Sequence, residues 1–333
     1  MTVWREILDL ARRTPSPHNT QPWKVSLETD VARLYLDPSR ALPDEDVTGC
    51  FVVAALGMFV ETVSIAAANR GFGVVVAPAD LERAREAARG NILERVHVAS
   101  LVLRRGAEPD PALPDRLIVE RRTSRLAPSP RPIPAEALED VRAEAAVCGQ
   151  RVHLIDDPAT VARAMRLNLE AVVEDLNEPK YHDEIVSWFR FTSRQEEESR
   201  DGLSARCMAM PGYEMSLLAR FPGIARWPIV GPVVRALYRR RLGPTRRLMV
   251  MDGRFWDAEA AFTAGRCLMR LWLVLTRHGL SIHPFGNLIT NGMASAAFRE
   301  LTGIEDPWIV FRVGFTDEPP RSLRLELEDI LVE

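Results

Sequence analysis

Two long apolar segments, residues 49–70 and 257–278, constrain the fold of this chain more than any other feature. A glycine follows each helical stretch, Gly71 and Gly279, and glycine commonly ends an α-helix. A helix that is apolar on most sides must be buried by the rest of the protein. The longest uninterrupted apolar run, residues 50–60, is shorter than the roughly 20 residues that span a bilayer. We therefore expect two central core helices and no transmembrane helix.

The two segments belong to a weak internal repeat. Gly57 and Gly265 lie inside them at positions 208 residues apart, the same displacement that separates Gly71 from Gly279. A strand-like stretch before AEPDP in the first half corresponds to one before TDEPP in the second. The order of elements predicts an α+β unit that occurs twice in one chain, a fused pseudo-dimer.

Periodicity and turn residues predict the remaining elements. We expect three parts: an N-terminal half at 1–106, a linker at 107–133 and a C-terminal half at 134–333. Residues 178–245 are aromatic, rich in arginine and broken by Gly and Pro, so we interpret them as an inserted helical cap. The expected helices are 3–13, 79–89, 135–146 and 158–175, and the expected strands are 23–28, 31–36, 73–76, 96–104, 151–155 and 307–314.

Composition excludes several classes of protein. Hydrophobic residues make up 47% of the 333 residues, which excludes a disordered chain. A net charge of −3 argues against a dedicated nucleic-acid binder. The four cysteines are scattered with no CxxC pair, so we expect neither a zinc site nor a disulfide framework. The N-terminus lacks the features of a signal peptide, so we expect a cytoplasmic protein. Because no spanning segment is expected, we also expect no membrane partner.

Two polar segments each occur in only one half. The loop PSPHNTQPW (15–23) separates helix from strand in the first half, where the second half has only VCGQ. The segment ERRTSR (120–125) precedes the second half and has no counterpart before the first. In a pseudo-twofold pair, one segment from each half can meet at the interface and form a single site.

These segments resemble motifs of the nitroreductase family. PSPHNTQPW is similar to the family's PSxxNxQPW loop, and RRTSR to its RRSxR segment. HGLSIHPFGN (278–287) and GFTDEPPRSLRLELEDIL (314–331) resemble two further family segments in the expected order. A fused chain with one motif in each half and a lid-like insertion resembles the Acg-type branch. The resemblance implies a nitroreductase-like α+β fold with central long helices, a helical lid and one FMN at the pseudo-dimer interface.

The resemblance also implies which residues would hold FMN. Arg121 and Thr123 would bind the phosphate and ribityl end, with Arg122 as their neighbour, and Arg125 would face the pyrimidine edge. Arginine suits this role because it offers bidentate hydrogen bonds to anions. Alternatively, RRTSR is a solvated basic turn. The other implied residues are Ser16, Pro17, His18, Asn19 and Gln21 in the loop, Pro284, Gly286 and Asn287 in PFGN, and Arg321 and Arg324 near the C-terminus.

Several of these positions keep an ordinary structural alternative. His18 is either a proton donor or a surface residue, and PFGN is either a contact to flavin N5 or a plain turn. Arg321 and Arg324 are either phosphate ligands or surface charges, and Arg324 is the better candidate. Trp23 is assigned to the core. The sequence assigns no catalytic residue and no metal ligand.

The implied function is that of an FMN-dependent oxidoreductase, which transfers hydride through flavin N5 to or from a small organic substrate. NAD(P)H is a candidate electron donor. The chain lacks a dinucleotide fingerprint, because Gly71 and Gly73 have no third glycine. This does not exclude NAD(P)H, because nitroreductase-like enzymes stack nicotinamide directly on the flavin. Two alternatives are an Acg-like protein that holds flavin with little turnover and a biosynthetic dehydrogenase. Because the dimer is fused in one chain, the protein is expected to be able to act as a monomer.

Overall fold

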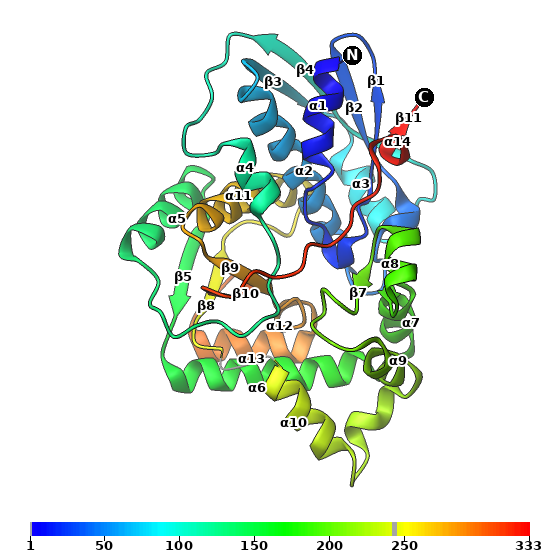
Figure 1. The fold of residues 1–333 in the computed structure, drawn as a ribbon, viewed down its shortest axis with the longest axis vertical. Helices are drawn as coiled ribbons and strands as arrows, with labels where there is room; N and C mark the ends of the chain where they lie inside the picture. Colours follow the sequence, from blue (N-terminus) through cyan, green and yellow to red (C-terminus); the bar gives the residue numbers. More distant parts are fainter. Residues whose placement is uncertain (1, 242–244) are drawn as a thin grey trace.

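The computed structural model describes residues 2–241 and 245–333 and shows a mixed α+β architecture, as predicted (Figure 1). One sheet has the strand order β11-β1-β2-β4-β3, and a second has the order β5-β8-β10-β9. All pairs in the two sheets are antiparallel except β1 with β11. The first sheet contains β1 (Trp23–Leu27), β2 (Val31–Leu36), β3 (Phe72–Pro78), β4 (Val96–Arg105) and β11 (Leu331–Val332); the second contains β5 (Arg151–Ile155), β8 (Leu248–Asp252), β9 (Ser281–Pro284) and β10 (Pro307–Gly314).

The two halves share one topology once β11 is set aside. In each sheet the spatial order is first, second, fourth and third strand along the chain. The long helix α2 (Cys50–Ala68) connects the second and third strands of the first half, and α11 (Ala258–Arg277) does so in the second. Helix α1 (Thr2–Ala11) precedes the first unit as α5 (Ala135–Val147) precedes the second. The two halves thus share a strand order and the place of their long helix; the internal duplication and the fused pseudo-dimer stay predictions.

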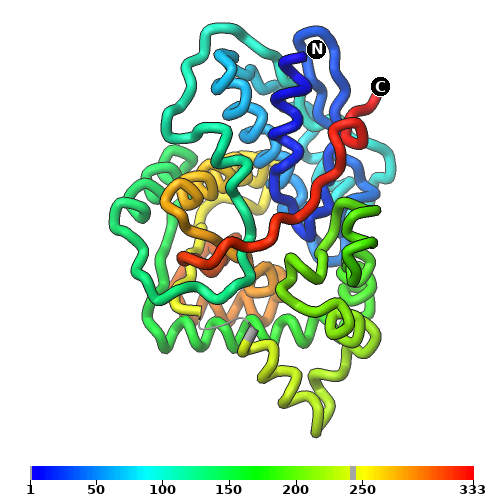
Figure 2. Tube along the Cα trace, viewed as in Figure 1, coloured from blue at the N-terminus to red at the C-terminus, as the bar shows by residue number. Residues whose placement is uncertain are grey.

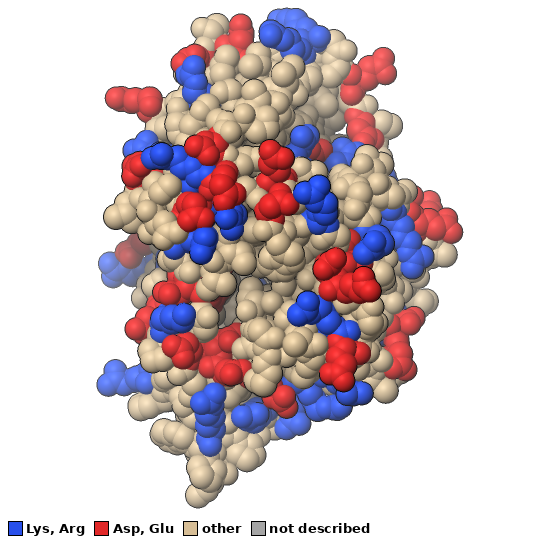
Figure 3. Space-filling view, turned by 180° about the vertical axis from the view of Figure 1, so that it is seen from behind, with Lys and Arg blue, Asp and Glu red and all other residues tan. Residues whose placement is uncertain are grey.

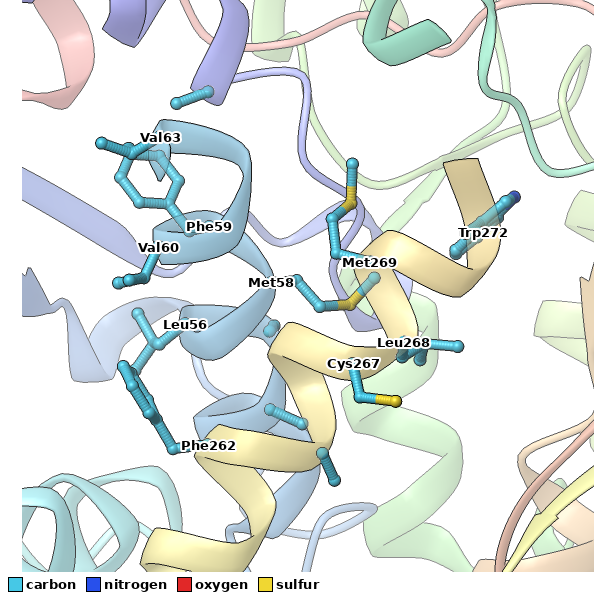
Figure 4. Packing of buried hydrophobic residues seen from close by; sticks show 14 of the residues in the cluster. Leu56, Met58, Phe59, Val60, Val63, Phe262, Cys267, Leu268, Met269 and Trp272 are labelled. Atoms are coloured by element: carbon cyan, nitrogen blue, oxygen red, sulfur yellow. The ribbon is translucent and has the colours of Figure 1, made fainter. Parts of the chain in front are cut away.

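Helices α2 and α11 pack against each other at the centre of the molecule. Figure 4 shows Met58 between them, and Leu56 and Val60 on the side of α2 that faces away from α11. Nearly every residue of α2 is buried, as its uniformly apolar sequence predicted. By length and composition α2 could also cross a membrane, but 89% of its most apolar window is buried inside this protein.

Shorter helices complete the two units. Helix α3 (Leu81–Ala88) lies between β3 and β4 in the chain, and α12 (Asn287–Thr290) and α13 (Gly292–Thr302) lie between β9 and β10. Helix α4 (Asp115–Glu120) interrupts the segment expected to be a linker, and α14 (Leu327–Ile330) precedes the last strand. The sequence analysis did not anticipate β8, β9, α4 or α13. The expected bounds of helix 158–175 and strands 151–155 and 307–314 are confirmed.

A long insertion lies between β5 and β8, where the first half has only a short turn at residues 28–30. It spans residues 156–247 and begins with α6 (Pro158–Asp175), which packs on α12 and α13. The remainder contains residues 178–245, which we interpret as a cap, and its last helices project from one end of the molecule (Figure 2). Its further elements are α7 (Pro179–Ser187), β6 (Phe189–Arg190), α8 (Ser193–Ser199), β7 (Leu203–Ser204), α9 (Gly212–Arg220), the 3-10 helix η3 (Pro222–Arg226) and α10 (Gly231–Arg241).

Candidate functional site

The loop between α1 and β1 adopts an unusual backbone conformation. Pro17–Asn19 form a 3-10 turn, and His18, Asn19 and Gln21 have φ angles of 48°, 57° and 54°. Residues other than glycine rarely adopt such angles, and each costs about 1–3 kcal/mol unless its surroundings hold it in place. Strained positions of this kind concentrate at functional sites.

Gln21 holds this loop in place. Its backbone N–H donates to the Ser16 hydroxyl at 2.9 Å, and its side-chain oxygen accepts from the Leu325 N–H at 2.9 Å. Its side-chain amide donates to the Arg200 carbonyl oxygen at 3.0 Å. Gln21 is fully buried, so it fastens the loop to both the C-terminal segment and the cap. Trp23, at the start of β1, is buried in the core as predicted.

The RRTSR segment lies beside β9 of the second half. Thr123 forms a parallel bridge with Ile282, and the Ser124 N–H donates to the Ile282 carbonyl oxygen at 3.0 Å. This pairing places RRTSR next to the PFGN turn that follows β9. Two of the predicted motifs are therefore neighbours in space.

A cluster of three arginines forms where RRTSR, α1 and the C-terminal segment meet. Arg121 is 6% exposed, donates to the Arg13 carbonyl oxygen at 2.9 Å and lies over the Trp272 ring at 4.6 Å. Burial, together with the charge of Arg324, lowers the pKa of Arg121 to about 9. Burial lowers the pKa of Arg324 to about 10, and the nearby Arg13 and Arg12 charges act in the same direction.

These three side chains lack an anionic partner. Among the described residues no carboxylate forms an ion pair with Arg13, Arg121 or Arg324, and the buried Nε atom of each has no hydrogen-bond partner. Burying unpaired cations together is costly, because each loses hydration and repels its neighbours. The cluster therefore has the donors and the charge to hold a dianion such as a phosphate monoester.

The two other predicted phosphate ligands lie differently. Arg122 forms an ion pair with Glu318 and donates to the Pro319 carbonyl oxygen at 2.8 Å, although its Nε is also without a partner. Arg321 is exposed, and its backbone carbonyl accepts a hydrogen bond from Arg206. The structure thus brings Arg121 and Arg324 together and leaves Arg122 and Arg321 at the edge of the cluster.

A second buried group surrounds Arg125. Its guanidinium donates to the Cys207 carbonyl oxygen at 3.1 Å, and burial lowers its pKa. His283 is 8% exposed, and burial, together with the Arg125 and Arg312 charges, holds its pKa well below the usual value. His283 is therefore neutral at physiological pH. Its Nδ1 has no hydrogen-bond partner, so this group offers polar contacts to a bound molecule.

His18 and Asn19 lie at the border of this region. His18 contacts Glu45 at 3.0 Å, and its Nδ1 is buried without a partner. Although burial alone lowers it, the pKa of His18 is raised overall by Glu45 and, more weakly, by Glu184. Asn19 donates to the Leu323 carbonyl oxygen at 3.1 Å, while its own side-chain oxygen has no partner. His18 is thus held on a carboxylate rather than free at the surface.

The PFGN turn contributes an open backbone position. Pro284 pairs with Phe311 in the sheet, and Gly286 is in helical conformation with no atom within 4 Å of where a Cβ would lie. The Asn287 side chain donates to Asp175 on α6 at 2.7 Å. Gly286 therefore leaves room for a ligand, whereas the Asn287 amide is already engaged.

The cap lies directly over these residues. The Gly202 N–H donates to the Asn19 carbonyl oxygen at 3.3 Å, and the Arg200 side chain donates to the Arg324 carbonyl oxygen at 2.9 Å. Asp201 is buried between Arg40 of the first half and Arg190 of the cap. Residues 200–207 thus make hydrogen bonds to the loop, to RRTSR and to the C-terminal segment.

Sequence reasoning missed Arg13, Trp272 and the cap residues at 200–207. Arg13 comes directly before the TPSPHNTQPW stretch, and its position beside the expected cofactor-binding loop was the signal that could have identified it. Trp272 and Arg200 carried none, because only the fold brings them to the site. No group of three or more metal-ligating side chains occurs within the described ranges.

No family model matches the chain. It is 26% identical over 191 residues to a provisionally named NAD(P)H nitroreductase of Mycobacterium tuberculosis strain CDC 1551 / Oshkosh, and equally to one of strain H37Rv. Each match covers 55% of this chain and 50% of the relative, so the chain spans about half the length of the curated relatives it matches.

Solved structures also align with the chain. The FMN-dependent nitroreductase NfnB of Mycobacterium smegmatis, determined with NADPH, is 17% identical with a TM-score of 0.40, covering 65% of this chain and 95% of that one. A nitroreductase-like protein of Bacillus cereus is 13% identical with a TM-score of 0.34, covering 64% and 91%. The sequence relatives confirm the resemblance to nitroreductase-like proteins, while the Acg-type branch stays a prediction.

Proposed function

We propose that this chain is an FMN-dependent oxidoreductase that binds one FMN where the loop at 15–23, RRTSR, PFGN and the C-terminal segment meet. The observation that carries the proposal is the cluster of Arg13, Arg121 and Arg324. The Nε atom of each is buried without a hydrogen-bond partner, and no carboxylate among the described residues forms an ion pair with them. Arg121 is buried as a whole, whereas Arg13 and Arg324 are partly exposed. A phosphate monoester supplies the missing negative charge and acceptors. The sequence relatives, which are named as NAD(P)H nitroreductases, agree with this assignment.

The remaining residues of the site suit the rest of an FMN molecule. Arg125 and the Asn19 side-chain oxygen offer a donor and an acceptor for the edge of a uracil-like ring. Gly286 leaves room for close approach of the ring to the backbone. When bound, FMN supplies the hydride chemistry at N5, and the protein positions it and tunes its charge.

The protein's own groups have separate tasks in this proposal. The arginine cluster binds the phosphate, while the positive charge of Arg125 favours the negative charge that develops on the reduced ring. His18 contacts Glu45, which raises the pKa of the imidazole and so favours a proton at this position in the site. Residues 200–207 exclude water from it. We propose NAD(P)H as the electron donor and a small organic molecule as the substrate.

The cap favours a second candidate function. Its hydrogen bonds to Asn19, Arg125 and Arg324 close the site in the present conformation. A protein that holds flavin beneath such a lid and reacts slowly with NAD(P)H would resemble the Acg-type branch. The two functions share one cofactor site and differ in access to it.

Titration of the flavin-free protein with FMN and with riboflavin tests the site. We expect one FMN per chain and much weaker binding of riboflavin, which lacks the phosphate. Arg121→Met and Arg324→Met should weaken FMN binding at least tenfold and leave riboflavin binding nearly unchanged, whereas Arg142→Met, on the exposed face of α5, should change neither. Equal affinity for both flavins in the unaltered protein would refute the assignment. Stopped-flow reduction by NADH and NADPH then separates turnover from simple retention.

A further inference from the structure

The end of the cap carries an unusual concentration of positive charge. Between Glu214 and Asp252 the chain has eight arginines and neither aspartate nor glutamate, in a protein whose net charge is −3. In the described part of the chain, no ion pair involves the exposed Arg220, Arg226, Arg239 or Arg240. Their charge is therefore available to an external partner.

The same segment exposes large apolar side chains. Ile229 is 87% exposed and Val233 is 58% exposed, and Trp227 is half exposed. Isolated exposed apolar residues are ordinary, but a contiguous group usually marks an interaction site. We call the exposed surface of residues 212–240, which comprise α9, η3, most of α10 and the segments between them, the cap tip; its exposed apolar residues are Tyr213, Leu217, Phe221, Trp227, Ile229, Val230, Val233 and Leu237.

The exposed apolar side chains of α10 lie on one face of the helix, and its other face packs on the protein. Val233, Leu237 and Arg240 follow the i, i+4, i+7 spacing of one helix face, and all three are exposed. Tyr238 lies on another face, where its hydroxyl is buried near Arg125. Because that inner face is already packed, the apolar outer face remains without a partner among the described residues.

The cap tip also projects from the body of the protein. In Figures 1 and 2, η3 and α10 form the end of the molecule farthest from the two termini. Figure 3 shows acidic and basic groups interspersed over most of one face. The projecting end has an apolar extremity, and basic side chains lie next to it on the side toward the body of the protein. A flat surface could touch this end without meeting the rest of the protein.

We propose that the cap tip is a docking surface for an anionic lipid bilayer, which it binds from one side without crossing it. Apolar side chains on one face and arginines beside them are the pattern of interfacial helices, in which the former enter the acyl boundary and the latter contact anionic headgroups. The sequence-based expectation of no membrane partner rested on the lack of a spanning segment and did not address a surface of this kind.

Two other occupants fit the observations less well. A second copy of the chain in a twofold interface would bring like charges together, since the same patch would face itself. A nucleic acid would use the arginines but would leave Ile229, Val233 and Leu237 against phosphates or water. Both are outcomes of the test.

The test is co-sedimentation of the full chain with vesicles of phosphatidylcholine containing about one third phosphatidylglycerol, compared with pure phosphatidylcholine. We expect binding to the anionic vesicles only, weakening as salt rises. Each arginine near such a surface contributes roughly a fivefold change in affinity, so Arg239→Glu with Arg240→Glu should weaken binding at least tenfold. Ile229→Asp should also weaken vesicle binding at least tenfold, although it leaves every arginine in place. A blue shift of fluorescence on binding should disappear in Trp227→Phe.

Matched substitutions elsewhere serve as controls. Leu93→Asp places a charge at an 86% exposed apolar position in the first half, and Arg142→Glu reverses an exposed charge on α5; both should bind vesicles normally. Failure to sediment with anionic vesicles at low salt would overturn the proposal, as would binding that is equally strong in the cap-tip variants. A lipid-free dimer abolished by Ile229→Asp would assign the surface to a second copy. Tight binding to single-stranded DNA without vesicle binding would assign it to nucleic acid.

Discussion

Gly57 and Gly265 make reciprocal contacts where the two central helices cross. A Cβ on Gly57 would lie 2.1 Å from the Phe262 carbonyl oxygen, and one on Gly265 would lie 2.0 Å from the Ala54 carbonyl oxygen. Phe262 follows Ala54 by 208 positions, as Gly265 follows Gly57. Each contact is therefore repeated with the halves exchanged, as at a twofold axis.

This relationship predicts that neither glycine tolerates a methyl group. Gly57→Ala or Gly265→Ala forces the helix backbones apart, and we expect each to cost about 3 kcal/mol of unfolding free energy. The double variant should cost less than the sum, because one displacement of the helices relieves both clashes. Urea denaturation measures this, with Gly292→Ala, which meets open space, as the control. Unchanged urea midpoints would show that the helices can separate without penalty.

The sequence predicted the central helices and the matching order of elements, because their signals are local. Residues 49–70 are mostly apolar, and Gly71 follows them. Strand β8 escaped prediction since its five buried residues follow a long insertion, and its pairing with β5 crosses that whole insertion. Nothing local shows that such a short apolar run belongs in the middle of a sheet.

The candidate site was predictable as a set of motifs but not as a set of orientations. Arg121 and Arg122 are adjacent, yet Arg121 lies buried beside Arg324 and Arg122 pairs with Glu318. In extended backbone, neighbouring side chains point to opposite sides. Which one points inward depends on the pairing of Thr123 with Ile282, and this is a tertiary contact. The roles of the site residues themselves stay predictions.

Removing the charge of Arg121 should weaken flavin binding without lowering the stability of the flavin-free protein. In the flavin-free protein Arg121 is buried without an anion, so Arg121→Met should raise the unfolding free energy by about 1 kcal/mol or leave it unchanged. The same substitution should weaken retention of flavin. Thermal denaturation with and without added FMN gives both quantities, and Arg240→Met on the cap tip is the comparison. A variant that is less stable without flavin yet keeps FMN fully would contradict the prediction.

Asp201 should hold the cap against the first half of the protein. It lies between the guanidiniums of Arg40 and Arg190, and it is 7% exposed. Asp201→Ala leaves two cations without their anion, for which we expect a loss of about 3 kcal/mol. If the cap controls access, FMN should also dissociate faster and reduction by NAD(P)H should accelerate. Glu198→Ala, which breaks an exposed pair with Arg194, should have little effect on any of these. Faster unfolding without any change in flavin kinetics would mean that the cap only packs on the core.

Glu184 should make stability depend on pH. It accepts hydrogen bonds from the Asp44 and Glu45 N–H groups, but burial, reinforced by the neighbouring Glu45 and Asp44 charges, raises its pKa to about 7. A carboxyl group with a raised pKa stabilises the folded state when protonated, and that contribution is lost as pH rises from about 4.5 through about 7. We expect the melting temperature to fall over this window and the fall to be smaller in Glu184→Gln. Asp183→Asn, at an exposed neighbouring position, should keep the slope of the unaltered protein. An identical slope in Glu184→Gln would rule out this group as the cause.

A single chain should suffice for flavin binding. Helices α2 and α11 bury each other within one chain, and their apolar side chains contribute about 1.5–3 kcal/mol each when fully buried. The loop at 15–23 lies in the first half, RRTSR lies in the segment before the second half, and each occurs once in the chain. We therefore expect a monomer that holds one FMN. Light scattering of the flavin-loaded protein at decreasing concentration, with absorbance after denaturation to count flavin, measures both quantities. A mass that stays at two chains, with flavin lost whenever they separate, would place the site between chains and overturn the fused-dimer interpretation.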